Sequence, residues 1–383
     1  FRRERTLLIL KGLDFPAQQL VTDDVGWMIG RDQRWENHPS RTGMPRRHVL
    51  EDYIALNEVG RTVNMKVLAP LVLGEWDKNN ILRRVPYSNK YGENWDSAPF
   101  LDYEEAEKIR DYVNSSEYIE PAIHGLLHDV WYNGENIGGQ EYFIPEGYKR
   151  GGNKQLAPPE YLRSHLDAFF EIYQSWGFTK KIRGFVSPGG PNNAWETNTL
   201  ASIVKEYGVL YWCNHRIEKC IVQNGIIINN KTIVLAPWEA YDLDPDTLPA
   251  YTAETAGIIG GHWPNLLRYN PALNLERLDA WKRFFERQAE VFGIILSRDI
   301  EFAEYQQLYK YYSNITEQDG MIIIDLSDAD KQKPAGPCQP LYISVRNGIT
   351  PVVSEGGTLS LYETMQNFSN YRIDRAGARI VIA

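Results

Sequence analysis

Two histidines four positions apart and a pair of adjacent aspartates are the side chains in this sequence best suited to chemistry. His124 and His128 belong to the segment HGLLH. On one helical turn this spacing would place both imidazoles on the same side, where they could share a metal ion. An HxxxH pair alone is equally typical of a structural role. Asp23 and Asp24 follow the apolar segment QLVT, and adjacent aspartates are also common in surface turns and helix caps.

The expected positions of these residues favour a metal site. The ranges 19–22 and 120–124 have the composition of buried strands, so both groups stand at strand ends. Two buried carboxylates repel each other unless a cation offsets their charge. One aspartate could then be a ligand and the other a base. An Asp-His-His set leaves coordination positions open for water and substrate, as in catalytic zinc sites.

The elements that must position these residues alternate between short apolar strands and amphipathic helices over the first 300 residues. About seven such units predict an α/β fold, a distorted (β/α) barrel with a largely parallel sheet. Working residues in such folds lie at the carboxyl ends of the strands. The residues at predicted strand ends are Asp23, Asp24, His124, Ser187, Cys213 and His262.

Several boundaries follow from local signals. A helix is predicted over 45–59, ended by Gly60, and a hairpin over 221–234 around Asn229-Asn230. A last short strand is predicted over 293–296. From about Gly320 the sequence consists of short strands without a helical period. We therefore predict a barrel domain over 1–315 and a small antiparallel β domain of sandwich type over 316–383.

Composition narrows the classes of function. The 383 residues carry a net charge of −9 without a basic stripe, so no nucleic-acid partner is expected. No apolar run approaches the length of a membrane span. The three cysteines, Cys213, Cys220 and Cys338, are expected to be free thiols. The high aromatic content fits either a well-filled core or a groove that stacks on sugar rings.

Four segments, TDDVG, HGLLH, FVSPGG and IIGGH, stand in an order and at strand ends that resemble the polysaccharide deacetylase family, the NodB-like carbohydrate esterases. The resemblance covers about residues 15 to 300. It implies a distorted (β/α) barrel with a divalent metal, usually zinc. It also implies roles for five residues: Asp23 as general base, His262 as general acid, and Asp24, His124 and His128 as metal ligands.

The sequence departs from that family's pattern at two places. The arginine expected just before Pro188 is absent, because Val186 and Ser187 stand there, and Arg183 lies further upstream. The Asp-Trp signature of the fourth motif is also missing, and Trp212 or Trp238 is the candidate for its apolar role. The residues predicted to bind substrate are Pro188, Gly189, Trp212, His215 and Trp238.

These observations predict a metal-dependent hydrolase that removes N- or O-linked acetyl groups from a carbohydrate. One alternative keeps the metal but changes the substrate to a non-sugar amide or ester. Another is a carbohydrate-binding relative without turnover, which the missing arginine favours and the intact Asp and His residues oppose. The expected partner is an acetylated carbohydrate, and chemistry on sugar polymers predicts a location outside the cytoplasm.

Overall fold

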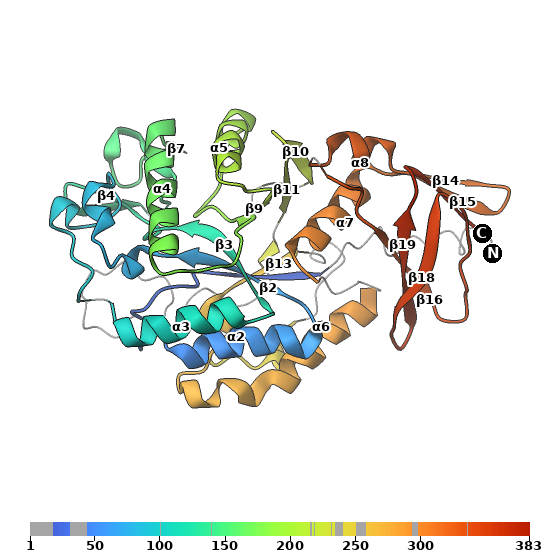
Figure 1. The fold of residues 1–383 in the computed structure, drawn as a ribbon, viewed down its shortest axis with the longest axis horizontal. Helices are drawn as coiled ribbons and strands as arrows, with labels where there is room; N and C mark the ends of the chain where they lie inside the picture. Colours follow the sequence, from blue (N-terminus) through green and yellow to red (C-terminus); the bar gives the residue numbers. More distant parts are fainter. Residues whose placement is uncertain are drawn as a thin grey trace.

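A curled nine-stranded sheet is the centre of the molecule (Figure 1). The computed structural model describes residues 18–30, 44–99, 101–138, 140–214, 217, 219–230, 232–233, 240–249, 258–292, 298–334 and 336–383. Eight strands are parallel to their neighbours, and only β10 is antiparallel. In spatial order the strands are β10 (Ile221–Gln223), β11 (Ile226–Asn230), β9 (Tyr211–Asn214), β8 (Gly184–Phe185), β3 (Ile119–Gly125), β2 (Val67–Val72), β1 (Gln19–Asp23), β13 (Ile258–His262) and β12 (Thr232–Ile233).

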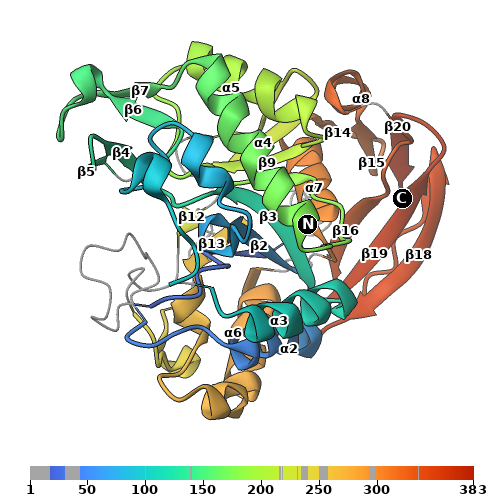
Figure 2. The ribbon, with the colours of Figure 1, turned by 60° about the vertical axis from the view of Figure 1, so that its left-hand side comes forward.

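Among the described residues, the sheet is curled but does not close into the predicted barrel. Its edge strands β10 and β12 do not pair with each other within the described residues. Helices α2, α3 and α6 lie along one side of the sheet, and α4 and α5 along the other in both views (Figures 1 and 2). The helix bounds are α2 (Leu50–Val63), α3 (Tyr103–Ser115), α4 (Pro159–Ser175), α5 (Ala194–Glu206), α6 (Leu278–Phe292), α7 (Ile300–Tyr312) and α8 (Ser327–Gln332).

Two further groups of elements complete the chain. Hairpins β4 (Val130–Tyr132) with β5 (Glu135–Gly138), and β6 (Phe143–Pro145) with β7 (Lys154–Leu156), follow β3. The C-terminal residues form two antiparallel sheets: β14 (Asn314–Gln318), β15 (Met321–Asp325), β20 (Arg379–Ile382) and β17 (Val353–Glu355), and β16 (Leu341–Arg346), β19 (Phe368–Arg375) and β18 (Gly357–Thr364). Short 3-10 helices lie at Gly74–Trp76, Ile81–Arg84, Gly92–Asn94, Glu146–Tyr148, Pro245–Thr247, Trp263–Leu266 and Pro271–Arg277.

Helix α7 packs between the large sheet and the C-terminal sheets (Figure 1). Successive residues of a strand point to opposite faces. Val21, Ala122 and Ile258 belong to one hydrophobic cluster with α7 and the C-terminal strands. Their neighbours Leu20 and Ile123 belong to a second cluster, formed with the other helices. We call the face of Val21, Ala122 and Ile258 the α7 face, because α7 packs against it.

The start and the end of helix α2 differ from the prediction. The helix begins after Val49 and continues to Val63, so Gly60 lies inside it. A Cβ at Gly60 would lie 2.6 Å from the carbonyl oxygen of Met65 and 2.8 Å from Tyr118 Cβ. Gly60 thus permits close packing of the helix instead of ending it. Asn64, in the left-handed conformation, is the actual cap.

The β10–β11 hairpin turns at Asn224-Gly225, not at Asn229-Asn230 as predicted. Both turn residues have positive φ values, 52° and 76°. Asn-Gly is the dipeptide that a two-residue hairpin turn favours for this reason. Asn229 and Asn230 instead continue β11 beside β9. The strand predicted over 293–296 lies outside the described residues.

The structure confirms the predicted free thiols. Cys213 and Cys220 are buried free thiols, and Cys338 is an exposed one. In the described part of the chain, none of the helices has the length and apolar character needed to cross a bilayer.

Replacing the buried Glu304 of α7 by glutamine is expected to reduce the pH dependence of stability. Burial raises the pKa of Glu304 to about 8, against the hydrogen bonds from Asn229 and Cys213. An unfolded glutamate ionises near pH 4.3. Between these values the unfolded chain binds fewer protons than the folded one, so the free energy of unfolding falls as pH rises, by up to about 1.4 kcal/mol per pH unit.

Urea denaturation between pH 5 and 8 measures this slope. Glu304→Gln should remove the contribution of one ionisable group to the slope of the free energy of unfolding against pH. Burial and the nearby Asp299 raise the pKa of Glu120 to about 7, so below that pH Glu120 should still contribute to the slope in the variant. An identical slope in the variant and the wild type would contradict the assignment.

Candidate metal centre

Asp24, His124 and His128 meet at the carboxyl ends of β1 and β3. One ligand atom from each lies within 4.8 Å of the others. Asp24 Oδ1 is 3.4 Å from His124 Nε2 and 3.9 Å from His128 Nε2. Two ligands, each about 2.1 Å from a tetrahedral zinc ion, are about 3.4 Å apart. The spacing therefore suits one small cation bound by all three side chains.

The turn that carries Asp24 is held by strand β2. Asp24 has a φ of 68°, a conformation that aspartate tolerates better than most residues. The amide of Val25 donates to the Pro70 carbonyl at 3.2 Å, and Val72 donates to Val25 at 2.7 Å. Gly26 has a φ of 112°, and a Cβ there would lie 2.5 Å from Val72 O. The TDDVG segment is thus a close-packed turn that needs its glycine.

The segment HGLLH is not a helical turn, which corrects the geometry predicted for it. His124 lies in β3, and His128 follows in a turn with a φ of 65°. The two rings nevertheless meet, with centroids 5.1 Å apart. The turn is wrapped around the buried carboxylate of Glu141, which accepts the amide N–H groups of Leu126 and His128. A long-range contact therefore creates the proximity that a helix was expected to provide.

The hydrogen bond from His124 to Val186 turns its Nε2 toward Asp24, an arrangement that is compatible with a cation between the two. His124 Nδ1 lies 2.6 Å from the Val186 carbonyl oxygen, and a carbonyl only accepts, so Nδ1 carries a proton. If Nε2 kept its lone pair, that lone pair would face the Asp24 carboxylate and be repelled. A proton or a metal ion between them removes the repulsion. Burial alone would lower the pKa of His124, but Asp24 and Asp23 raise it above its ordinary value.

Burial and the neighbouring histidines also act in opposite directions on the pKa of Asp24. Burial favours the neutral acid, but the contact with His124 and the charges of His128 and His262 outweigh it and hold the pKa of Asp24 well below its usual range. Asp24 Oδ1 is buried and accepts no hydrogen bond of ordinary geometry from the described residues. An ionised, buried carboxylate oxygen beside two imidazoles is a donor set that fits a divalent cation.

Asp23 and His262 flank the three candidate ligands. They are direct partners in the parallel pairing of β1 with β13. By the alternation of the strands, Asp23, His124 and His262 all lie on the α7 face, with Val21, Ala122 and Ile258. The His262 amide donates to Asn265 Oδ1 at 2.8 Å, which fixes the backbone at the strand end. The predicted base and acid thus stand side by side next to the ligands.

The predicted substrate-binding residues have different positions. Pro188 is buried and Gly189 is partly exposed, in the loop after β8. Gly189 has a φ of 73°, and a Cβ there would lie 2.3 Å from the Gln140 side chain. Trp212 is fully buried and packs on Phe185 in the cluster on the opposite face of the sheet. This corrects its predicted place in a substrate site. His215 and Trp238 lie outside the described residues.

Trp195 was not singled out from the sequence but is the most exposed large aromatic residue described. It lies in the first turn of α5, which follows the loop that contains Pro188, and its exposed fraction is 68%. Nothing in the sequence around Trp195, which follows a Pro-Gly loop, indicated that its side chain would be exposed. An exposed indole face is suited to stacking on a sugar ring.

Arg183 does not replace the arginine that the resemblance leads one to expect. Its guanidinium pairs with Glu301 of α7 at 2.9 Å and lies 3.8 Å from Glu120. Arg183 precedes β8, so it stands at the amino end of the parallel strands. Asp23 stands at the carboxyl end of β1. Arg183 therefore lies at the opposite end of the sheet from Asp23, where its ion pair with Glu301 holds α7.

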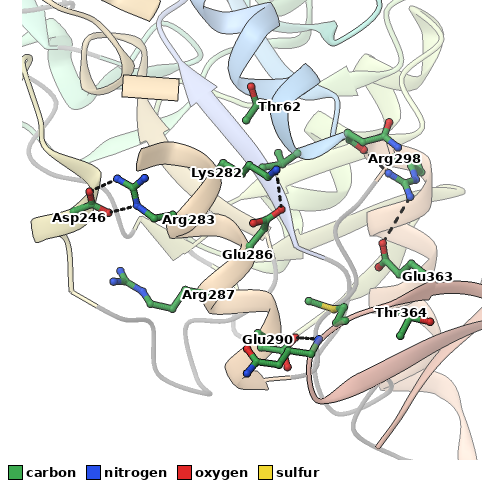
Figure 3. A pocket seen from close by; sticks show the side chains of 14 residues that line it. Thr62, Asp246, Lys282, Arg283, Glu286, Arg287, Glu290, Arg298, Glu363 and Thr364 are labelled. Atoms are coloured by element: carbon green, nitrogen blue, oxygen red, sulfur yellow. Dashed lines mark hydrogen bonds and ion pairs between the residues drawn. The ribbon is translucent and has the colours of Figure 1, made fainter. Parts of the chain in front are cut away.

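A pocket of about 790 Å³ lies elsewhere, between α2, α6 and the end of β18 (Figure 3). Charged residues line it, and most of them pair with one another: Arg283 with Asp246, Lys282 with Glu286, and Arg298 with Glu363. None of the five candidate metal or proton-transfer residues lines this pocket. Its size alone therefore does not make it the functional site.

Comparisons with known proteins give weak structural neighbours. No protein-family model matches the chain, and no curated protein matches it in sequence. A CE4 family pseudoenzyme from Bacillus anthracis is 12% identical, over 76% of this chain and 66% of that chain, with a TM-score of 0.37. A protein from Parabacteroides distasonis, provisionally described as a glycoside hydrolase/deacetylase, is 12% identical over 83% and 79%, with a TM-score of 0.43.

A third neighbour, provisionally described as a polysaccharide deacetylase, comes from Mycobacterium smegmatis. It is 14% identical over 75% of this chain and 78% of that chain, with a TM-score of 0.32. At these identities and scores, the roles of Asp24, His124 and His128 rest on the geometry of this chain's own residues.

Proposed function

We propose that this protein is a metal-dependent hydrolase that removes acetyl groups from a carbohydrate. The observation that carries the proposal is the meeting of Asp24, His124 and His128 within 4.8 Å, with Asp23 and His262 paired beside them. Three protein ligands leave a coordination position for water or substrate. The resemblance of the four segments to polysaccharide deacetylases supports the acetylated carbohydrate as substrate.

Zinc is the ion that the ligand set favours in this proposal. Two imidazole nitrogens and one carboxylate oxygen suit zinc and its transition-metal neighbours better than magnesium or calcium, which prefer oxygen ligands. Val186 fixes the tautomer of His124 through its carbonyl, so that Nε2 is directed toward Asp24. A divalent cation there would acidify water and polarise the acyl carbonyl.

The chain's own residues supply proton transfer. Asp23, at the end of β1, takes the proton from the water that attacks the acyl carbon. His262, its partner on β13, gives a proton to the departing amine or alcohol. Because both side chains lie on the α7 face with His124, one bound acyl group could contact all three. The exposed indole of Trp195 offers a platform for a neighbouring sugar ring.

One observation favours a second candidate, a carbohydrate-binding protein without turnover. The arginine expected to orient the base is absent from the third motif, and Arg183 pairs with Glu301 at the other end of the strands. The metal ligands would then be structural or would bind an acyl group without hydrolysing it.

Metal content and acetate release, measured on the same preparation, test both candidates. The substrates are N-acetylglucosamine oligomers and O-acetylated xylan oligomers. One equivalent of zinc together with acetate release supports the hydrolase. Zinc with saturable oligomer binding but no acetate supports the binding protein, and a chain that takes up no divalent metal contradicts both.

A further inference from the structure

Glu141, from the segment between the two hairpins that follow β3, is buried against the turn that carries His128. It is fully buried, and its carboxylate accepts three successive backbone amides. Leu126 N lies 2.8 Å from Oε2, Leu127 N lies 3.2 Å from it, and His128 N lies 3.0 Å from it. Consecutive amides turned toward one anion form a nest, normally a binding site for an external anion. Here the chain supplies the anion itself.

The nest holds a backbone that is otherwise unfavourable. His128 has a φ of 65°, a left-handed conformation that costs a histidine energy unless its surroundings enforce it. At Gly125 a Cβ would lie 2.5 Å from Glu141 Oε2, so glycine is needed for this approach. The amide of Glu141 also donates to the His128 carbonyl at 2.8 Å. Glu141 thus hydrogen-bonds to both main-chain polar groups of His128, accepting from its N–H and donating to its carbonyl oxygen.

His165 of α4 balances the buried charge of Glu141. Its Nδ1 lies 2.9 Å from Glu141 Oε1, and its Nε2 lies 2.9 Å from the Pro86 carbonyl oxygen. Since the carbonyl only accepts, Nε2 carries a proton, and one further proton is shared between Nδ1 and the carboxylate. Tyr161, one turn earlier on α4, donates to the Glu141 carbonyl at 3.0 Å. The pair is therefore neutral overall and fixed at every polar atom.

We infer that Glu141 and His165 are positioning residues of the metal centre, which set the affinity for the ion by fixing where His128 stands. This inference rests on the proposed function and extends it to residues that do not touch the ion. Outer residues that orient metal ligands typically change metal affinity by about 10- to 100-fold when they are replaced.

Glu141→Gln tests the inference with little change in shape. Its amide can still accept from the nest with one oxygen, but it loses the second acceptor, which Leu126 and His165 share. Zinc affinity, measured by competition with a chelator, should fall by about 10- to 100-fold, and the absorption spectrum of the cobalt-substituted protein should change. His165→Gln, which removes the imidazole that is hydrogen-bonded to the Glu141 carboxylate, should weaken zinc binding in the same direction.

Asp77→Asn is the matched control. Asp77 is also a fully buried carboxylate that holds a turn, through the amides of Ile81 and Leu82 and the indole N–H of Trp95, and none of these belongs to the site. It should lower stability while leaving zinc affinity and the cobalt spectrum unchanged. Wild-type zinc affinity and spectrum in both Glu141→Gln and His165→Gln would overturn the inference. A wild-type chain that binds no zinc or cobalt would instead overturn the proposed function.

Discussion

Asp24→Asn is expected to weaken zinc binding by on the order of a hundredfold or more. Asparagine keeps the size of the side chain and tolerates the left-handed backbone at this position, where φ is 68°. It removes the charge that lies 3.4 Å from His124 Nε2 and 3.9 Å from His128 Nε2. The loss of a direct ligand should exceed the 10- to 100-fold effect of an outer residue.

Thermal unfolding with and without zinc measures this change. An ion that binds only the folded state stabilises it by about 2.7 kcal/mol at a concentration a hundred times its Kd. Wild-type protein should therefore gain thermal stability on addition of zinc, and Asp24→Asn should gain little at the same concentration. An equal gain in both proteins would show that Asp24 is not a ligand.

Asp23→Asn is expected to reduce acetate release by about 10²- to 10⁴-fold while one equivalent of zinc remains bound. General-base catalysis typically contributes a factor of this size. Asp23 is buried at the strand end and paired in register with His262, but it is not one of the three side chains that gather around the candidate ion. Its replacement should therefore change turnover far more than metal affinity.

The zinc content of the Asp23→Asn protein is the internal control. Acetate release should also be measured as a function of pH. The part of the wild-type pH–rate profile that reports the ionisation of Asp23 should be absent in the variant. Loss of zinc together with loss of activity would place Asp23 among the ligands. Full activity with zinc bound would exclude it as the base.

The strand ends could be predicted because their signals are local. Short apolar runs followed by polar residues placed Asp24, His124 and His262 at the carboxyl ends of β1, β3 and β13, as the structure has them. The start of α3 depends on an equally local contact, since the Asp102 side chain accepts from the Glu105 amide at 3.2 Å. Parallel pairing then brings the ends together, a consequence of topology more than of any one motif.

The fine structure of the site depends on contacts between distant segments. The proximity of His124 and His128 comes from Glu141 and, through it, from His165, 24 positions further along the chain. Neither residue stands in a motif, and a histidine inside a helix is typical of a structural role. Gly60 was misread for a related reason, since its role depends on Met65 and Tyr118 packing against the helix.

X-ray absorption at the zinc edge of the loaded protein tests the central claim most directly. We predict one zinc per chain with two imidazole nitrogens and a carboxylate oxygen at about 2.0–2.2 Å, completed by a further light atom. His124→Ala should lose the signature of one imidazole. Zinc bound with sulfur neighbours or without imidazole, or no stoichiometric zinc at all, would contradict the assignment of Asp24, His124 and His128 as its ligands.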